Sequence, residues 1–287
     1  MLAGFLFGST FLVVQDAIER AAVLPFLAVR FAVGGAVLWP IARRRPSSPG
    51  EVRHGVLAGA CLVVGFLFQT FGLQHTTSSS SAFITYLLVV LVPVIGVFRT
   101  RRLPTRAVAL GVVLAVVGLL LLSGGPSGFG RGELLTVGAA VFFALHLVVL
   151  GEVSGRHDPV RLTMWQVLTV AAVYVGPGAL AHGGYAFPAS VWAAAAFCGV
   201  GATAAAFWCM SYGQQVVPNS QAAIILLLEP VSAGVLGSIA GDHLGGVGFA
   251  GAALILVAVL VAELGDRRSP APVGNELGVV TGASDGP

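Results

Sequence analysis

The sequence predicts an all-α polytopic membrane protein with ten transmembrane helices in two inverted five-helix repeats. Three observations predict this fold class: an apolar composition, ten regularly spaced apolar runs, and a repeat of the first half in the second. Hydrophobic residues make up 56% of the 287 residues and charged residues only 9%, whereas a soluble domain has about 25% charged residues. A spanning helix needs about 20 mostly apolar residues, so ten such helices with short loops fill the chain.

The ten apolar runs are separated by loops rich in arginine, glycine or proline. We expect helices at about residues 1–17, 25–42, 55–73, 80–98, 106–122, 133–150, 160–181, 191–212, 220–240 and 247–264. Residues 1–123 then form the first repeat and residues 132–265 the second, joined by the connector 124–131, which is rich in Gly, Pro and Ser. Residues 266–287 are rich in Pro, Gly and small polar residues and are expected to be a disordered cytoplasmic tail.

The distribution of arginine predicts the orientation of these helices. All fifteen basic residues are arginine, and the formal net charge is +3. With ten spans, both termini lie on the same side of the membrane. The loops and the tail on that side hold twelve arginines, whereas the loops on the opposite side hold only Arg20 and Arg131. The remaining arginine, Arg30, lies within a helix. The positive-inside rule therefore places both termini in the cytoplasm. The positive charge reflects a multi-pass protein of the cytoplasmic membrane, in contact with a lipid bilayer, and does not indicate a nucleic-acid partner.

The two halves match when the chain is shifted by 140 positions. The polar and glycine matches include Gln74 with Gln214, Ser80 with Ser220, and Gly111 with Gly251. Because each unit has an odd number of helices, the second unit must enter the membrane from the opposite side. Inverted repeats are the architecture of many secondary transporters, which bind substrate near the membrane midplane where the repeats meet. The predicted topology therefore favours transport.

Several motifs follow the order found in a known transporter family. They are Gly8-Ser9-Thr10-Phe11, Pro25 followed by Arg30-Phe31, Gln74-His75-Thr76-Thr77, Glu229-Pro230 and Gly241-Asp242. Over residues 1–265 the chain resembles the EamA-type transporters of the drug/metabolite transporter superfamily. The resemblance implies ten helices in two inverted repeats around a central cavity, commonly with export of small metabolites. The family often has a basic residue where Gln15 stands, so its absence here argues against an anionic substrate.

Glu229 is the strongest candidate for a functional residue. At a rise of 1.5 Å per residue it lies about 10 Å below the start of its helix, where a charge is costly to bury and where Pro230 removes a backbone hydrogen bond. A low dielectric favours the protonated form of a carboxyl group, which suits proton coupling. The alternative is a structural carboxyl that caps backbone groups freed by Pro230.

Other polar and aromatic side chains within the apolar runs are candidates for substrate binding. They are Gln15, Gln69, Thr85, Tyr86, His146 and Trp208. Each has a structural alternative: glutamines join membrane helices, a lone membrane histidine is often a packing residue, and Trp208 with Tyr212 suits an aromatic belt at a membrane face. Arg30, near the expected outer end of its helix, is expected to extend to the lipid headgroups.

Small residues at helical spacing predict where helices pack closely. Gly111 with Ala115, and Gly248 with Ala252, indicate packing faces on the fifth and tenth expected helices, with a homodimer through these helices as one alternative. The three cysteines, Cys61, Cys198 and Cys209, lie in apolar runs without metal-ligand spacing. No metal or other cofactor is therefore expected.

The predicted function is a secondary transporter that exports a small metabolite, amino acid or drug-like compound by alternating access, with proton coupling or simple facilitation. The chain has no lysine and no phosphate-binding glycine loop, which disfavours ATP-driven transport. Two other classes stay open. One is an intramembrane enzyme, although no His-Glu-x-x-His motif is present and the Gly-x-Ser-x-Gly match at residues 282–286 lies in the expected disordered tail, not between a strand and a helix. The other is a membrane scaffold without transport activity.

Overall fold

The computed structural model describes residues 2–100, 105–124, 129–216 and 228–266, and these residues form helices and turns without any strand. The α-helices are α1 (Leu2–Ile18), α2 (Val23–Ala42), α3 (Glu51–Leu73), α4 (Ser78–Thr85), α5 (Leu88–Thr100), α6 (Arg106–Leu122), α7 (Arg131–Val153), α8 (Pro159–Leu180), α9 (Ala189–Phe197), α10 (Phe207–Val216), α12 (Leu228–Ile239) and α13 (Gly245–Asp266). A 3₁₀ turn, η1 (Ser154–Arg156), follows α7, and a π-helical segment, η2 (Cys198–Ala206), joins α9 to α10.

Seven helical segments are long and apolar enough to cross a membrane. They are Val23–Ala42, Glu51–Leu73, Ser78–Gly96, Arg131–Arg156, Pro159–Leu180, Ala189–Gln215 and Gly245–Ala262. Three shorter apolar helices, α1, α6 and α12, have between 10 and 17 residues. The protein is therefore an all-helical, multi-pass membrane protein, as its composition predicts. Residues 220–227 of the expected ninth helix and residues 267–287 of the expected tail lie outside the described part of the chain.

Two of the expected helices are interrupted. The helix expected at 80–98 is divided into α4 and α5 at Tyr86 and Leu87, where the Leu87 and Val89 amides donate to carbonyl oxygens three residues back, each at 3.1 Å. The helix expected at 191–212 consists of α9, η2 and α10, and the wider π turn is frequent at functional sites. Hydropathy does not predict such changes, because an apolar run keeps its composition whichever hydrogen-bond register it adopts.

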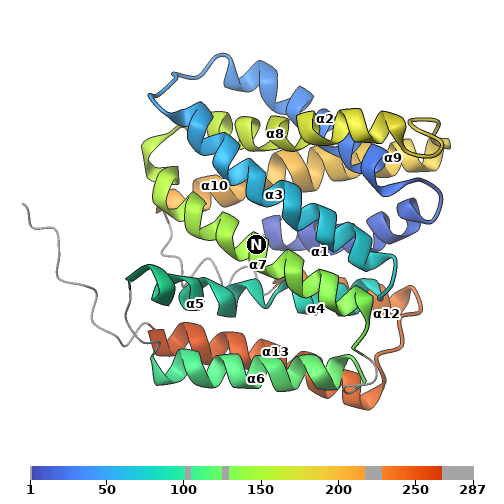
Figure 1. The fold of residues 1–287 in the computed structure, drawn as a ribbon, viewed down its shortest axis with the longest axis vertical. Coiled ribbons are helices and arrows are strands. Elements are labelled where there is room, and N and C mark those ends of the chain that lie inside the picture. Colours follow the sequence, from blue (N-terminus) through green and yellow to red (C-terminus); the bar gives the residue numbers. More distant parts are fainter. Residues whose placement is uncertain (1, 101–104, 125–128, 217–227, 267–287) are drawn as a thin grey trace, which may run out of the picture.

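Helices from the two halves of the sequence pack against each other throughout the molecule. Figure 1 shows α6 and α13 side by side at one edge, with α4, α5 and α12 beside this pair and the other helices beyond them. The helix α2 packs against α8 and η2, α3 packs against α7 and α8, and α1 packs against α12 and η2. The short helix α4 contacts both α7 and α12. The helices α1, α3, α4, α7 and α12 thus come together, with parts of α2, α5 and α10, around a common internal region.

Two glycines bring helices of opposite halves into unusually close contact. A Cβ atom at Gly8 on α1 would lie 2.0 Å from Ser232 Oγ and 2.4 Å from the Glu229 carbonyl oxygen on α12. A Cβ atom at Gly34 on α2 would lie 2.7 Å from Thr203 Cγ2 in η2. Any side chain at either position would push the helices apart, so these glycines determine where α12 meets α1 and where η2 meets α2.

The small residues of α6 and α13 face each other inside the chain. A Cβ atom at Gly111 would lie 2.9 Å from the Ala258 carbonyl oxygen, and one at Gly118 would lie 2.9 Å from the Gly251 carbonyl oxygen. The packing faces expected from the sequence are therefore used within one molecule. A homodimer formed by this helix pair would have to use its opposite, apolar face, where Val113 and Val257 are exposed, and it stays a prediction.

Candidate functional site

A cavity of about 70 Å³ lies where α1, α2, α3, α7, α10 and α12 meet the break between α4 and α5. It is lined by Phe7, Thr10, Phe11, Arg30, Phe66, Gln69, Thr85, Tyr86, Leu88, Phe143, His146, Leu147, Phe207, Met210 and Glu229. Five of the seven candidate residues from the sequence border this cavity, namely Gln69, Thr85, Tyr86, His146 and Glu229. Gln15 and Trp208 do not border it. The cavity thus brings together side chains that lie as far apart in sequence as Phe7 and Glu229.

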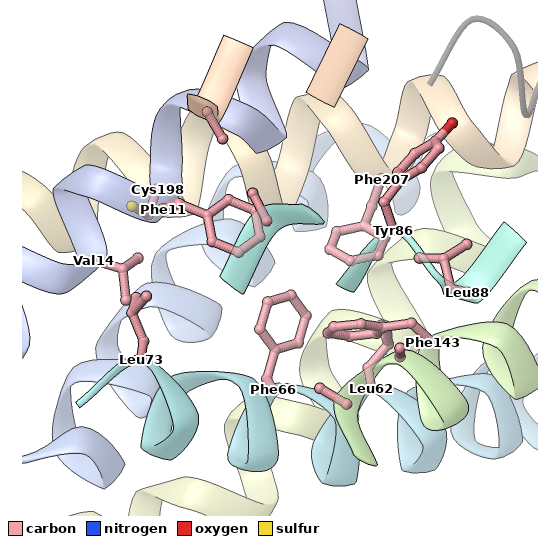
Figure 2. Packing of buried hydrophobic residues seen from close by; sticks show 14 of the residues in the cluster. Phe11, Val14, Leu62, Phe66, Leu73, Tyr86, Leu88, Phe143, Cys198 and Phe207 are labelled. Atoms are coloured by element: carbon pink, nitrogen blue, oxygen red, sulfur yellow. The ribbon is translucent and has the colours of Figure 1, made fainter. Parts of the chain in front are cut away.

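Phenylalanine rings form much of the cavity wall. Figure 2 shows Phe11, Phe66, Phe143 and Phe207 directed toward a common region from α1, α3, α7 and α10. The Phe66 ring centroid lies 5.1 Å from that of Phe143 and 6.0 Å from that of Phe207, with both pairs in edge-to-face geometry. Such rings pack well against flat or apolar groups, so the wall suits the apolar part of a small molecule.

Glu229 brings a carboxyl group to the cavity from α12. The contact between Gly8 and the Glu229 carbonyl oxygen fixes this turn of α12 against α1. Ser232 Oγ donates to the same carbonyl oxygen at 2.9 Å. No hydrogen bond or ion pair from any described residue reaches the carboxyl group itself. The carbonyl oxygen that Pro230 leaves without a helical donor is that of residue 226, which lies outside the described residues, so the alternative in which this carboxyl caps freed backbone groups stays open.

Arg30 also lines the cavity, and the expectation that it reaches the lipid headgroups is wrong. The residue is 2% exposed. Its Nε atom donates to Thr203 Oγ1 at 3.1 Å, and its guanidinium carbon lies 4.8 Å from the Phe66 ring centroid and 5.6 Å from that of Phe31. Because α2 begins at Val23, Arg30 lies about two turns inside the helix, on the face that packs against η2. Its depth makes it a member of the site that sequence reasoning missed.

Two polar pairs complete the wall of the cavity. His146 Nε2 lies 2.7 Å from Gln166 Oε1, and Gln166 Nε2 donates to the Leu162 carbonyl oxygen at 3.2 Å. Gln69 Nε2 donates to Thr85 Oγ1 at 3.2 Å and so links α3 to α4. Since the Gln166 amide nitrogen is used as a donor, its oxygen accepts from His146 and keeps a proton on Nε2. These pairs hold the polar side chains in place while leaving further donors and acceptors for a ligand.

Gln15 lies outside the cavity, at the end of the molecule where α3 ends and α4 begins. Its amide oxygen accepts from the Ser78 amide at 3.0 Å, and its amide nitrogen donates to the Thr76 carbonyl oxygen at 3.3 Å. Asp242 Oδ2 accepts from Ser78 Oγ, Ser79 Oγ and the Ser79 amide at 2.8–3.0 Å. We call these five residues the Gln15 cluster. It joins α1, α4 and the turn before α13, and Gln15 borders a separate, open pocket of about 740 Å³.

A second polar cluster lies at the opposite end of α3 and was not identified from the sequence. Glu51, the first residue of α3, forms an ion pair with Arg161 on α8. The His157 ring lies between Ser48 and His54, with Nδ1 2.6 Å from Ser48 Oγ and Nε2 2.7 Å from His54 Nδ1. Burial, and to a lesser extent His54, lowers the pKa of His157. We call these five residues the Glu51 cluster, which joins the α2–α3 loop to the α7–α8 loop.

Trp208 lies on the outside of α10. It is 40% exposed, and its ring centroid lies 6.3 Å from that of Tyr212, which is also exposed. The preceding residue, Phe207, is the one that lines the cavity. The exposed pair has the arrangement expected for the aromatic-belt alternative.

The described residues hold no group of three or more His, Cys, Asp or Glu side chains that could bind a metal ion. The three cysteines are free thiols. The ionisable side chains that line the cavity are Arg30, His146, Glu229 and Tyr86. None of the three cysteines lines it.

The fold and the site together define a class: a multi-pass helical membrane protein with an internal cavity that contains buried charged side chains. Within this class, the chain belongs to the EamA-like transporter family, whose sequence model matches residues 1–124 and 130–263. The resemblance noted from the motifs is thus confirmed across nearly the whole chain.

Similar proteins agree with this assignment. An uncharacterized transporter of Archaeoglobus fulgidus is 29% identical over 264 residues, which cover 92% of this chain and 84% of the relative. The uncharacterized transporter YwfM of Bacillus subtilis is 26% identical over 282 residues, which cover 93% of each chain. A crystal structure of a protein matches with a TM-score of 0.65 at 22% identity, covering 92% of this chain and 96% of the other, and so supports the fold.

Proposed function

We propose that this protein is a secondary transporter that exports a small metabolite, amino acid or drug-like compound across the cytoplasmic membrane by alternating access. In this proposal the ten expected helices all span the membrane, and both termini lie in the cytoplasm. The observation that carries the proposal is the position of the cavity between the Gln15 cluster and the Glu51 cluster. A central site between two sets of breakable polar contacts is the arrangement that alternating access requires.

The packing of the helices supports two inverted repeats. A shift of 140 residues pairs α1 with α7, α2 with α8, α3 with the α9–α10 segment, α4 and α5 with the α12 region, and α6 with α13. Under this pairing each contact should have an equivalent in which every helix is replaced by its repeat-related partner. The contact between α3 and α8 has its equivalent in that between α2 and η2. The contact between α1 and α12 has its equivalent in those of α4 and α5 with α7. The pairs α2–α8, α4–α12 and α6–α13 correspond to themselves. A two-fold relation between the halves would generate this set of contacts.

The two polar clusters suit the role of gates. Each cluster joins segments from both halves: Asp242 contacts Ser78 and Ser79 at one end of α3, and Arg161 contacts Glu51 at the other. By the arginine distribution, the Glu51 cluster would face the cytoplasm and the Gln15 cluster the outside. Opening one cluster while the other stays closed would expose the cavity to one side at a time.

Glu229 is the proposed coupling residue. Its carboxyl group borders the cavity and has no protein partner among the described residues, so binding or release of a proton there would change the charge of the cavity directly. A change of one unit charge in a low-dielectric site alters the affinity for any polar ligand. Proton exchange at Glu229 would therefore be linked to substrate binding.

The test is a flux measurement on the purified protein in liposomes. A mixture of metabolites is placed inside, and efflux is measured with and without a pH gradient for the wild type, Glu229→Gln and the control Glu19→Gln. Glu19 is an exposed carboxylate that borders the open pocket beside Gln15 and does not line the cavity. We expect gradient-dependent efflux of one compound class, loss of this dependence in Glu229→Gln, and wild-type behaviour in Glu19→Gln.

Two results would contradict parts of this proposal. Selective efflux that ignores both the gradient and Glu229→Gln would leave a transporter in which Glu229 has a structural role. The absence of selective efflux from folded protein would favour the enzyme or scaffold alternatives. Assays for turnover of the same mixture would then separate these two classes.

A further inference from the structure

We propose that the cavity binds the carboxylate of a substrate with an apolar body, and that Arg30 is the residue that recognises this carboxylate. The inference rests on the proposed transport function, because it names the substrate class of the same cavity. It also reverses the expectation drawn from Gln15. The chain lacks a cation at Gln15, but the structure places a different cation, Arg30, in the cavity wall.

The terminal nitrogens of Arg30 have no protein partner among the described residues. The only polar contact of the guanidinium group within this part of the chain is the hydrogen bond from Nε to Thr203 Oγ1. No described Asp or Glu forms an ion pair with it, and Glu229, on the same cavity, is not within 4.0 Å. Two described side-chain atoms, Ser81 Oγ and Gln214 Oε1, are fully covered by protein and have no hydrogen-bond partner. The terminal nitrogens of Arg30 are not covered in this way. Both nitrogens are therefore available to a molecule in the cavity.

The surroundings of Arg30 fix the orientation of the guanidinium plane. Thr203 holds Nε from one side, and the Phe66 and Phe31 rings lie against the guanidinium carbon. Thr203 reaches Arg30 because η2 approaches α2 closely: a Cβ atom at Gly199 would lie 2.7 Å from the Arg30 carbonyl oxygen. A guanidinium group held at Nε presents its terminal nitrogens as donors, and this fork matches the geometry of a carboxylate better than an ammonium group does.

Charge also favours an anionic ligand. A buried cation without a counterion is costly, and an incoming carboxylate would supply the missing charge and the missing acceptors together. Much of the rest of the wall is apolar, since Phe7, Phe143, Phe207 and Met210 border the same cavity. A ligand with one carboxylate and a hydrocarbon or aromatic body fits both parts of the wall. A sugar phosphate, by contrast, would bring several charges against these rings.

The inference is tested by comparing carboxylates with their neutral amides. Purified full-length protein in nanodiscs is dialysed against pooled matched pairs: isovalerate with isovaleramide, phenylacetate with phenylacetamide, and leucine with leucinamide. Retained compounds are quantified by mass spectrometry. We expect the wild type to retain at least one carboxylate about tenfold or more above its amide, because a charge-assisted bidentate contact is lost in the amide.

Variants then locate the preference. Arg30→Gln should abolish the preference for the carboxylate, and Arg30→Lys should weaken it because the fork is lost while the charge stays. Thr203→Val should weaken it because Nε loses the contact that orients the group. The matched control is Arg20→Gln, which removes an exposed arginine that is paired with Asp16 and does not line the cavity. This control should keep the wild-type preference.

Three outcomes overturn the inference: equal retention of carboxylates and amides by the wild type, retention of neither, or a carboxylate preference that survives Arg30→Gln. Should Arg30→Gln fail to fold, the wild-type comparison and Arg30→Lys still decide the question. Flux in liposomes separates this inference from the proposed function. Arg30-dependent binding without transmembrane flux contradicts transport alone, whereas selective flux of neutral compounds without carboxylate binding contradicts the role of Arg30 alone.

Discussion

The contact between α1 and α12 at Gly8 gives the sharpest prediction about the cavity. In Gly8→Ala the new Cβ atom would lie 2.4 Å from the Glu229 carbonyl oxygen and 2.0 Å from Ser232 Oγ. The serine hydroxyl can rotate away, but the carbonyl oxygen belongs to the backbone. The two helices must therefore separate by about 1 Å to regain ordinary van der Waals contact.

The expected cost can be estimated from this geometry. Overpacking a tight contact costs about 1–3 kcal/mol, and replacing glycine by alanine within a helix returns about 1 kcal/mol. The net loss of stability should be about 0–2 kcal/mol, whereas a glycine without such a contact should gain about 1 kcal/mol. Because the displaced carbonyl belongs to Glu229 itself, pH-gradient-dependent efflux should fall as well. Ser232→Ala in the Gly8→Ala background should restore only part of the stability, since it relieves only the contact with the hydroxyl.

Thermal unfolding followed by the fluorescence of the four tryptophans measures the loss. The control is Gly246→Ala, since Gly246 is helical on α13 and a Cβ atom there would meet no atom within 4 Å. Gly246→Ala should leave stability unchanged or slightly raised. If Gly8→Ala is as stable as Gly246→Ala and transports normally, the close contact between α1 and α12 is not the determinant that we infer.

The Glu51 cluster yields two further predictions. Arg161→Gln leaves the Glu51 carboxylate, whose side chain is 3% exposed, without its cation. It should lower the free energy of unfolding by about 2–3 kcal/mol, whereas Arg20→Gln, at an exposed pair, should cost less than about 1 kcal/mol. Equal losses in denaturant or thermal unfolding would contradict this assignment. The pKa of His157 is lowered in the folded protein, so the unfolded chain binds the proton more readily. The free energy of unfolding should therefore fall as the pH drops below the usual histidine pKa of about 6.5. Melting temperatures measured between pH 8 and pH 5 should fall less in His157→Gln than in the wild type. The same pH dependence in both proteins would exclude His157 as the cause of the loss.

Much of the cavity could be anticipated because polar side chains are rare in apolar runs. Glu229, His146, Gln69 and Thr85 stand out in the sequence for this reason, and the structure places all four at one cavity. Arg30 stands out equally, but its distance from the nearest helix end predicts the wrong environment. The face of α2 that packs against η2 depends on tertiary contacts, which one sequence does not contain.

Irregular helical turns hide which residues of a helix face the cavity. Trp208 and Phe207 are adjacent, but only Phe207 borders the cavity, because successive residues on a helix point about 100° apart. The π-helical segment before them changes the phase of the helix, so a face counted from α9 does not continue into α10. The Glu51 cluster could not be predicted, because it forms only where two loops about a hundred residues apart in the sequence meet. Neither hydropathy nor the charge distribution indicates that these loops are in contact.

The packing of α2 on α8, α4 on α12 and α6 on α13 has a consequence for biogenesis. The first half of the chain enters the membrane before its partners in the second half have been synthesised. Until then, the faces around Gly34 and Gly111 lie against lipid or against whatever assists insertion. The helix α6 is synthesised well before its partner α13, which is the last of the described helices to be made. The interface between α6 and α13 can therefore form only after α13 has been synthesised, later than the contact between α2 and α8.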